Sequence, residues 1–336
     1  MSGSWIRRLR LRAGALLYDY PQYREAVRSG AWRLMRNRNE RIATDGRGVR
    51  CEWEFTSDIH IANVFPSTGA ALMRLALRDW PIAMRGAPAT ISETPAVSFV
   101  IGHRGLSRLP HLLATLESIA GQTGVAFECI VVEQDRTPQL ETRIPAWVRY
   151  RFTPCDTDYN RSATLNEGVA AARGEVVILH DGDTLVPERY AAEVLARSRE
   201  GFEFIDVKRF VFYLRPEETQ RVFETKSLQP VSSTVTQNGK GVSVAAARRA
   251  YIGIGGFDEE FVGWGGEDND FWDRVHVHGN AYEFGYLPMV HLYHEAQKGK
   301  TDASGGGMRR YHDEIRSIPP EERIRRLLAR RTGAPR

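Results

Sequence analysis

Three short apolar runs constrain the fold of this 336-residue chain more than any other feature. They lie at residues 97–101, 129–132 and 176–179, and two segments with helical spacing of apolar residues, 109–119 and 162–173, lie between them. Alternating buried strands and amphipathic helices are typical of a parallel sheet covered by helices on both faces. We therefore predict an α/β fold built on such a sheet.

Polar residues follow each of the three runs, at the edge of such a sheet where ligands bind. They are His103 and Arg104, then residues 133–135, then Asp181 and Asp183. Two carboxylates separated by one glycine can face the same hard divalent cation, which prefers oxygen ligands and can bridge to phosphate. Because Asp-Gly pairs are common in turns, a simple turn is the alternative interpretation of this pair.

The segment 263–270 combines three glycines, one tryptophan and three acidic residues. Glycine lets the backbone approach a ligand closely, and Trp264 offers a flat face that can pack on a sugar ring. Glu267, Asp268 and Asp270 crowd into four positions, where their repulsion is unfavourable unless a cation or a reaction uses them. An acidic helix N-terminus would explain Asp268 and Asp270 but not the residues before them.

Two histidines three positions apart, His291 and His294, follow a further apolar run. Imidazole is a common metal ligand, so one of them is expected to complete the metal site begun by the aspartates. We favour His294 over His291. The alternative is a structural role, which is usual for a lone histidine.

Taken in chain order, these motifs resemble those of the GT-A-fold glycosyltransferases of family 2, especially the β-1,4-galactosyltransferases and bacterial chondroitin-synthase-type modules. The resemblance covers about residues 96–300. It rests on His103-Arg104, Val132-Glu133-Gln134, Tyr159-Asn160-Arg161 with Leu165-Asn166, Asp181-Gly182-Asp183, Gly241-Val242-Ser243, Trp264-Gly265-Gly266-Glu267-Asp268 and His294. It implies a GT-A, Rossmann-like, mostly parallel sheet flanked by helices. Outside the region of resemblance we expect an N-terminal extension and a helical basic C-terminal tail.

The resemblance also implies how a metal and a nucleotide are held. Asp183 is expected to bind Mn²⁺ (or Mg²⁺) directly, and Asp181 to contact the ribose or a metal-bound water. His294 matches the family's distal metal ligand, and His291 stands where the galactosyltransferases have methionine, so it could substitute as a ligand. The donor is expected to be a UDP-sugar. Its nucleotide is expected to contact His103, Arg104, Glu133, Tyr159 and Arg161, with Gly241 near the phosphates.

The catalytic residues implied by the resemblance are Glu267 and Asp268, with Asp268 as the base. Trp264, Gly265 and Gly266 are expected at the acceptor or donor sugar. A carboxylate beside the acceptor can take the hydroxyl proton while the oxygen attacks the anomeric carbon, and one such displacement inverts that carbon. Retaining N-acetylgalactosaminyltransferases resemble this region too but typically have asparagine after the glutamate, so Asp268 favours inversion.

We therefore expect a metal-dependent inverting glycosyltransferase that moves a sugar from a UDP-sugar to a hydroxyl of a glycan or glycolipid acceptor, in cell-surface polysaccharide synthesis. The alternatives are a retaining transferase, a transferase that uses another nucleotide, and a non-catalytic carbohydrate-binding protein of the same fold. The intact acidic and imidazole motifs argue against the last of these.

Both ends of the chain are basic. Residues 1–50 hold 12 arginines against four acidic residues, and residues 309–336 hold nine against four. Such ends could lie on an anionic membrane surface that carries a lipid-linked acceptor, or could simply keep the protein soluble. Nucleic acid is not expected as a partner, because no binding motif accompanies the arginines.

The three cysteines, Cys51, Cys129 and Cys155, fit neither a disulfide framework nor a zinc site, and Cys129 is expected in the core. No apolar run reaches 18 residues. We expect a cytoplasmic protein, with any membrane contact peripheral and at the inner face. The expected parts are a basic N-terminal extension (1–95), a nucleotide-sugar-binding half (96–215), an acceptor-binding and catalytic half (216–300), and a flexible loop with a basic tail (301–336).

Overall fold

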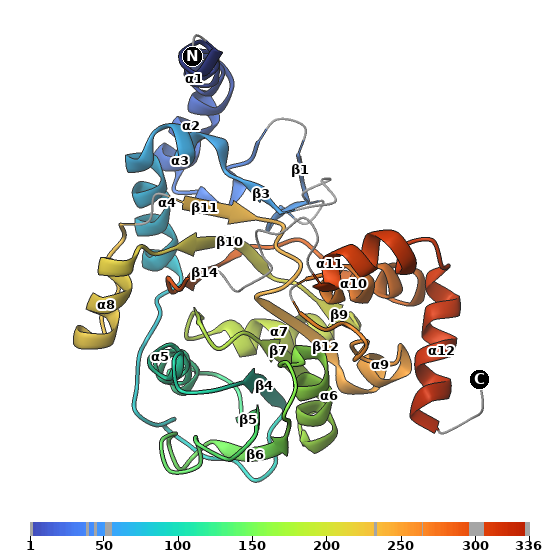
Figure 1. The fold of residues 1–336 in the computed structure, drawn as a ribbon. Coiled ribbons are helices and arrows are strands. Elements are labelled where there is room, and N and C mark those ends of the chain that lie inside the picture. The colour runs from blue at the N-terminus through green and yellow to red at the C-terminus, as the bar shows by residue number, and fades with distance from the viewer. Residues whose placement is uncertain are drawn as a thin grey trace.

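Two β-sheets form the centre of the molecule, with helices around them (Figure 1). The computed structural model describes residues 3–37, 40–43, 46–50, 56–231, 234–263, 265–295 and 306–332. The larger sheet has seven strands, in the spatial order β13 (Ala281–Tyr282), β9 (Phe204–Ile205), β12 (Ser243–Ala247), β7 (Val176–His180), β4 (Val97–His103), β5 (Phe127–Asp135) and β6 (Arg149–Pro154). Strands β7, β4, β5 and β6 run parallel, and β12 pairs antiparallel with β7. The predicted mostly parallel sheet is confirmed.

Each face of this sheet carries its own apolar core, because alternate residues of a strand point to opposite faces. Phe99 of β4 belongs to the core formed with helices α5 (Leu109–Ala120) and α7 (Tyr190–Arg199), which also contains the fully buried Cys129. Its neighbour Val100 belongs to the core formed with α6 (Arg161–Ala171), α9 (Arg248–Gly253) and α10 (Glu267–His278). The helical segments predicted at 109–119 and 162–173 are therefore confirmed.

The second sheet was not predicted. Its five strands are β3 (Ser57–Asp58), β11 (Thr234–Gln237), β10 (Lys208–Tyr213), β14 (Leu287–His291) and β8 (Thr184–Leu185), in that spatial order. Helices α3 (His60–Val64), α4 (Pro66–Asp79) and α8 (Pro216–Thr225) contribute to one core with it, in which Ile61 and Leu72 lie with Phe210 and Val290. The expected boundary at residue 95 therefore does not separate two cores, because the N-terminal region supplies a strand and two helices to this sheet.

The chain begins with three consecutive helical segments, α1 (Gly3–Gly14), η1 (Ala15–Asp19) and α2 (Tyr20–Ser29). They are followed by the turn η2 (Trp32–Leu34) and the antiparallel strand pair β1 (Arg41–Ile42) and β2 (Val49–Arg50). None of the described helices is both long enough and apolar enough to cross a lipid bilayer. Cys51 lies outside the described residues.

The basic tail is helical, as expected. It consists of α11 (Gly306–Arg310), η3 (Tyr311–Ile315) and α12 (Pro320–Thr332), whereas residues 301–305 lie outside the described part of the chain. The carboxylate of Asp270, 1% exposed, lies 2.7 Å from Nη2 of Arg274 and 2.8 Å from Nη1 of Arg323 on α12. Asp270, the third acid of the segment 263–270, therefore holds the tail against α10.

Replacing Asp270 by asparagine is expected to lower the free energy of unfolding by about 3 kcal/mol, because two buried arginines would lose their shared carboxylate. Urea unfolding followed by circular dichroism measures this. The matched control is Asp313→Asn. Asp313 pairs with Arg309, and their side chains are 62% and 63% exposed, so this substitution should lower the free energy of unfolding by less than about 1 kcal/mol. Equal effects of the two substitutions would contradict a structural role for the buried pair.

Candidate active site

The Asp-Gly-Asp segment connects the two sheets. It leaves β7 of the larger sheet and enters β8 of the smaller one, so Asp183 directly precedes the paired residue Thr184. Strand β8 pairs antiparallel with β14, in the register Thr184 opposite His291, and the backbone nitrogen of Leu292 donates to the carbonyl of Asp183 at 2.9 Å. This short pairing brings the end of β14 beside the acidic loop.

Asp183, His291 and His294 converge on one point. Nε2 of His291 lies 3.5 Å from Oδ1 of Asp183, and Nε2 of His294 lies 3.2 Å from Oδ2. One ligand atom from each residue lies within 4.8 Å of the others. Metal bonds of about 2.1 Å separate adjacent ligand atoms by about 3 Å, so the three side chains fit one divalent ion.

The protonation states of this cluster suit a metal site. Burial alone raises the pKa of Asp183, but its hydrogen bond with His294 and the charges of both histidines and Arg108 outweigh burial and hold that pKa below its usual value. Burial lowers the pKa of His291 more than the nearby Asp183 raises it. Nδ1 of His291 is buried and makes no hydrogen bond to the described residues. A charged carboxylate beside a neutral imidazole is the state that binds a metal.

Arg108 belongs to this cluster and was missed in the sequence. Its Nη1 lies 3.3 Å from Oδ2 of Asp183 and its Nη2 lies 3.0 Å from Nδ1 of His294. It immediately precedes α5, the first helix after β4. A basic residue between the first strand of a parallel sheet and its helix was the available signal, since anions bind at such positions.

Asp181 lies with Arg161 and is not among the three residues that converge. Its Oδ1 accepts from Nε of Arg161 at 3.0 Å and from Nη2 at 2.8 Å. Nη1 of the same arginine lies 3.2 Å from Oδ1 of Asp268 and 3.6 Å from Oε1 of Glu267. Arg161 is the first residue of α6, which Asn160 caps by accepting from the nitrogen of Ala163. This arginine therefore links the expected donor motif to the expected catalytic motif.

Glycines shape the approach to Glu267 and Asp268. Gly265 and Gly266 have φ values of 82° and 89°, in the left-handed region that favours glycine, and α10 begins directly after them. A β-carbon on Gly241 would collide with Oδ2 of Asp268. The structure thus places Gly241 against the expected base.

The Glu267 and Asp268 carboxyls bind protons more tightly than usual. Burial raises the pKa of Glu267 to about 7, and the charge of Asp268 adds to this effect. Burial also raises the pKa of Asp268, against the opposing charge of Arg161. Carboxyl groups with raised pKa values are suited to exchange a proton near neutral pH.

Three more of the expected donor residues lie at or near the end of β4. Nε2 of His103 is 2.9 Å from the carbonyl of Gly105, and Nη1 of Arg104 donates to the carbonyl of Thr157 at 2.5 Å. The hydroxyl of Tyr159 is 3.2 Å from Oγ1 of Thr164, and Gly102 of β4 leaves room for both, because a β-carbon there would collide with them.

Glu133 is held inside the protein. Strand β5 continues to Asp135, beyond the apolar run, because β6 pairs with it to that point. The Glu133 carboxylate is 0% exposed and accepts from the nitrogens of Gln139 and Leu140, at 3.0 and 3.1 Å, and from the hydroxyl of Tyr150 at 2.5 Å. It thus orders the loop after the strand and is not brought into the clusters around Asp183 and Asp268.

Trp264, expected at a sugar, lies outside the described residues. The glycines that follow it pack against the tail. A β-carbon on Gly266 would collide with the carbonyl of Gly307, and one on Gly265 would lie 3.3 Å from Cε of Met308. The start of α11 therefore rests on the segment that leads into α10.

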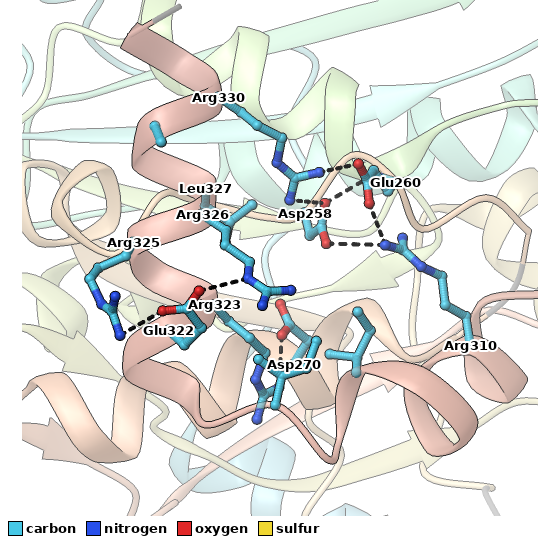
Figure 2. A pocket seen from close by; sticks show the side chains of 13 residues that line it. Asp258, Glu260, Asp270, Arg310, Glu322, Arg323, Arg325, Arg326, Leu327 and Arg330 are labelled. Atoms are coloured by element: carbon cyan, nitrogen blue, oxygen red, sulfur yellow. Dashed lines mark hydrogen bonds and ion pairs between the residues drawn. The ribbon is translucent and has the colours of Figure 1, made fainter. Parts of the chain in front are cut away.

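A separate charged cavity of about 530 Å³ lies between α12 and the segment around residues 258–260 (Figure 2). Ion pairs cross it: Nη2 of Arg330 lies 3.0 Å from Oδ1 of Asp258, and Nη2 of Arg310 lies 2.5 Å from Oε2 of Glu260 (Figure 2). Its lining residues do not include Asp183, His291 or His294, so this cavity is distinct from the Asp183 cluster.

Comparisons with known proteins agree with this arrangement. Residues 107–249 match the family model described as glycosyl transferase family 2. Residues 227–295, which include the glycines, the acidic pair and both histidines, match the model described as the N-terminal domain of galactosyltransferase. No curated protein matches the chain.

Proposed function

We propose that this chain, of which residues 107–249 match the glycosyl transferase family 2 model and residues 227–295 the galactosyltransferase model, is a metal-dependent, inverting enzyme that uses a UDP-sugar. The proposed acceptor is a hydroxyl group of a glycan or glycolipid, in the synthesis of a cell-surface polysaccharide in the cytoplasm. The observation that carries this proposal is the convergence of Asp183, His291 and His294, which come from two distant parts of the chain.

The donor set favours Mn²⁺ over Mg²⁺. Two imidazoles and one carboxylate offer two nitrogen ligands, whereas Mg²⁺ strongly prefers oxygen. We propose that Asp183, His291 and His294 all bind the ion and that Asp181 acts outside this set. When bound, such an ion supplies positive charge against the diphosphate that leaves with the nucleotide.

Two arginines support the binding of an anionic donor. Arg108 lies against Asp183 and His294, 28% exposed, with its charge next to the proposed metal ligands. Arg161 lies between Asp181 and Asp268, so a donor bound at the acidic loop would meet it on the side of the catalytic pair. Arginine suits phosphate because its planar group can make two parallel hydrogen bonds.

Asp268 is the proposed base. Arg161 holds its Oδ1 at 3.2 Å, and Gly241 allows its Oδ2 to lie against the backbone without a side chain between them. From that position the carboxylate would take the proton of the acceptor hydroxyl as its oxygen attacks the anomeric carbon. One base acting in one displacement inverts the configuration of that carbon.

Binding of nucleotide sugars with and without Mn²⁺ tests this function. We expect a UDP-sugar at about one hundred times its dissociation constant to stabilise the protein by about 2.7 kcal/mol, and only when Mn²⁺ is present. Differential scanning fluorimetry over UDP-, GDP- and CDP-sugars measures the shift in melting temperature. The anomeric configuration of the product, measured by NMR, then separates inversion from retention.

Stabilisation by a UDP-sugar equally with EDTA and with Mn²⁺ would contradict the metal site. Preference for GDP- or CDP-sugars would contradict the uridine donor, and binding without any transfer to glycan acceptors would favour a carbohydrate-binding protein. Asp156→Asn is the matched control variant, because Asp156 is an exposed acid outside both clusters.

A further inference from the structure

The first helix exposes large apolar side chains. Trp5 and Leu9 of α1 are each 59% exposed, and Leu16 and Leu17 of η1 are 52% and 70% exposed. Trp5 and Leu9 are four positions apart, which places them one above the other on the same face of a helix. Scattered exposed leucines need no explanation, but several large apolar side chains within 13 positions of one helical stretch mark an interaction site.

Positive charge accompanies this apolar surface. Residues 3–18 contain four arginines, at positions 7, 8, 10 and 12, and no acidic residue. Arg10 and Arg12 are exposed. A helix that combines arginine with tryptophan and leucine, and has no acidic side chain, is complementary to a lipid surface that is both apolar and negatively charged.

The helical stretch is fixed to the body at its other end. Ala15 is fully buried, and the carboxylate of Asp19, 5% exposed, lies 2.7 Å from Nδ1 of His60 at the start of α3. Figure 1 shows α1 extending from this point, beyond α2 and α3 and away from the larger sheet. The helical stretch is therefore anchored to the rest of the protein through η1 and the exposed α1 precedes that anchor.

In the described part of the basic tail, most arginines are paired within the protein. Arg310 and Arg330 pair with Asp258 and Glu260, and Arg323 pairs with Asp270. Even the exposed Arg325 and Arg326 both pair with Glu322 of the same helix. The arginines of α12 are thus largely balanced by carboxylates of the protein, whereas residues 3–18 contain no acidic residue at all.

We propose that α1 and η1 form an interfacial helix that binds the protein to an anionic lipid bilayer, with Trp5, Leu9, Leu16 and Leu17 inserted among the acyl chains near the headgroups. The arginines of the helix pair with the anionic headgroups, and tryptophan is favoured at this depth. The contact lies on the membrane surface and does not cross it. This inference concerns attachment and does not depend on the transfer reaction.

Vesicle binding by the full chain tests the inference. Vesicles of phosphatidylcholine with 30 mol% phosphatidylglycerol, about the anionic fraction that attracts basic segments, are compared with pure phosphatidylcholine by cosedimentation. We expect binding to the anionic vesicles, and a decrease of about a hundredfold in the partition coefficient for the triple variant Leu9→Glu, Leu16→Glu, Leu17→Glu. High salt should weaken binding of the unchanged protein without abolishing it, because the apolar contact is not screened.

Matched variants show whether this surface is specific. Ile91→Glu changes an apolar side chain that is 69% exposed elsewhere, and Arg309→Glu reverses an exposed charge of the tail, so neither should alter binding. In vesicles of brominated lipid, fluorescence should be quenched in the unchanged protein and less quenched in Trp5→Phe. Binding of the triple variant at the original strength, or equal loss in Ile91→Glu, would overturn the proposal. So would a dimer, found by analytical ultracentrifugation, that the triple variant dissociates, because the helix would then bind a second copy of the chain.

Discussion

Asp183→Ala is expected to lower the rate of sugar transfer by about a thousandfold or more, since a metal ion supplies several kcal/mol of charge stabilisation in reactions of this kind. The loss follows from the position of the carboxylate between two histidines, with Nε2 atoms at 3.2 and 3.5 Å, where alanine leaves only the nitrogen ligands. Transfer assays over a series of Mn²⁺ concentrations measure it. Binding of Mn²⁺ itself, followed by electron paramagnetic resonance, should weaken in parallel.

The Asp183→Ala variant should lose transfer while it folds as the unchanged protein does. The variant Asp156→Asn, which changes an exposed acid outside both clusters, should retain both Mn²⁺ binding and transfer. EDTA should lower the transfer rate of the unchanged enzyme to that of Asp183→Ala. Added Mn²⁺ should then restore the rate of the unchanged enzyme but not that of the variant. A variant that keeps wild-type transfer and Mn²⁺ affinity would show that Asp183 is a structural acid paired with Arg108.

Asp268→Asn is expected to lower kcat by about a thousandfold while the affinity for the UDP-sugar changes little, because a general base contributes on that scale. The amide preserves an oxygen for Arg161 but cannot take a proton. Isothermal titration with the donor and Mn²⁺, together with steady-state transfer rates, separates binding from chemistry. Wild-type rates in this variant would assign proton removal elsewhere.

The pH dependence of kcat/KM is a second test of Asp268 as the base. A base acts only when deprotonated, and burial raises the pKa of Asp268, so kcat/KM should fall on the acidic side at a pH above the usual range of aspartate. The residual activity of Asp268→Asn should lack that decline. Glu267→Gln should keep it, and a decline that disappears only in Glu267→Gln would identify Glu267, whose pKa is raised to about 7, as the base.

The larger sheet could be predicted because each of its central strands is a continuous apolar run between amphipathic helices. The smaller sheet could not, since β3 and β8 have two residues each and acquire their partners only through tertiary contacts. Its core draws Leu72 and Phe210 from segments about 140 positions apart. Hydrophobic periodicity is a local signal, so it does not report such pairings.

The candidate site was predictable in its acids, its histidines and Arg161, but not in Arg108. Asp183 and His294 belong to motifs that can be recognised in the sequence. Arg108 belongs to none of these motifs and contacts both residues only in the folded protein. Glu133 lies within β5, which continues beyond the apolar run because β6 pairs with it as far as Asp135. The expected contact of Glu133 with the nucleotide stays a prediction. The sequence did not show why Asp270 stands in the crowded acidic segment. In the structure its carboxylate accepts a hydrogen bond from Arg323, some 50 positions later in the chain.

The acidic loop between β7 and β8 has a mechanical consequence. Three residues span at most about 11 Å, so a linker this short has almost no slack, and its two ends are anchored in different sheets. Because Asp183 pairs with the end of β14, sliding of one layer over the other would carry Asp183 and both histidines together and displace them relative to Arg161 and Asp268, which lie on helices of the larger sheet. Substitutions in the apolar packing far from the acids would in this way change the distance between the proposed metal site and the proposed base. Adaptation of the enzyme to heat or cold would have to preserve the alignment of the layers as well as their stability.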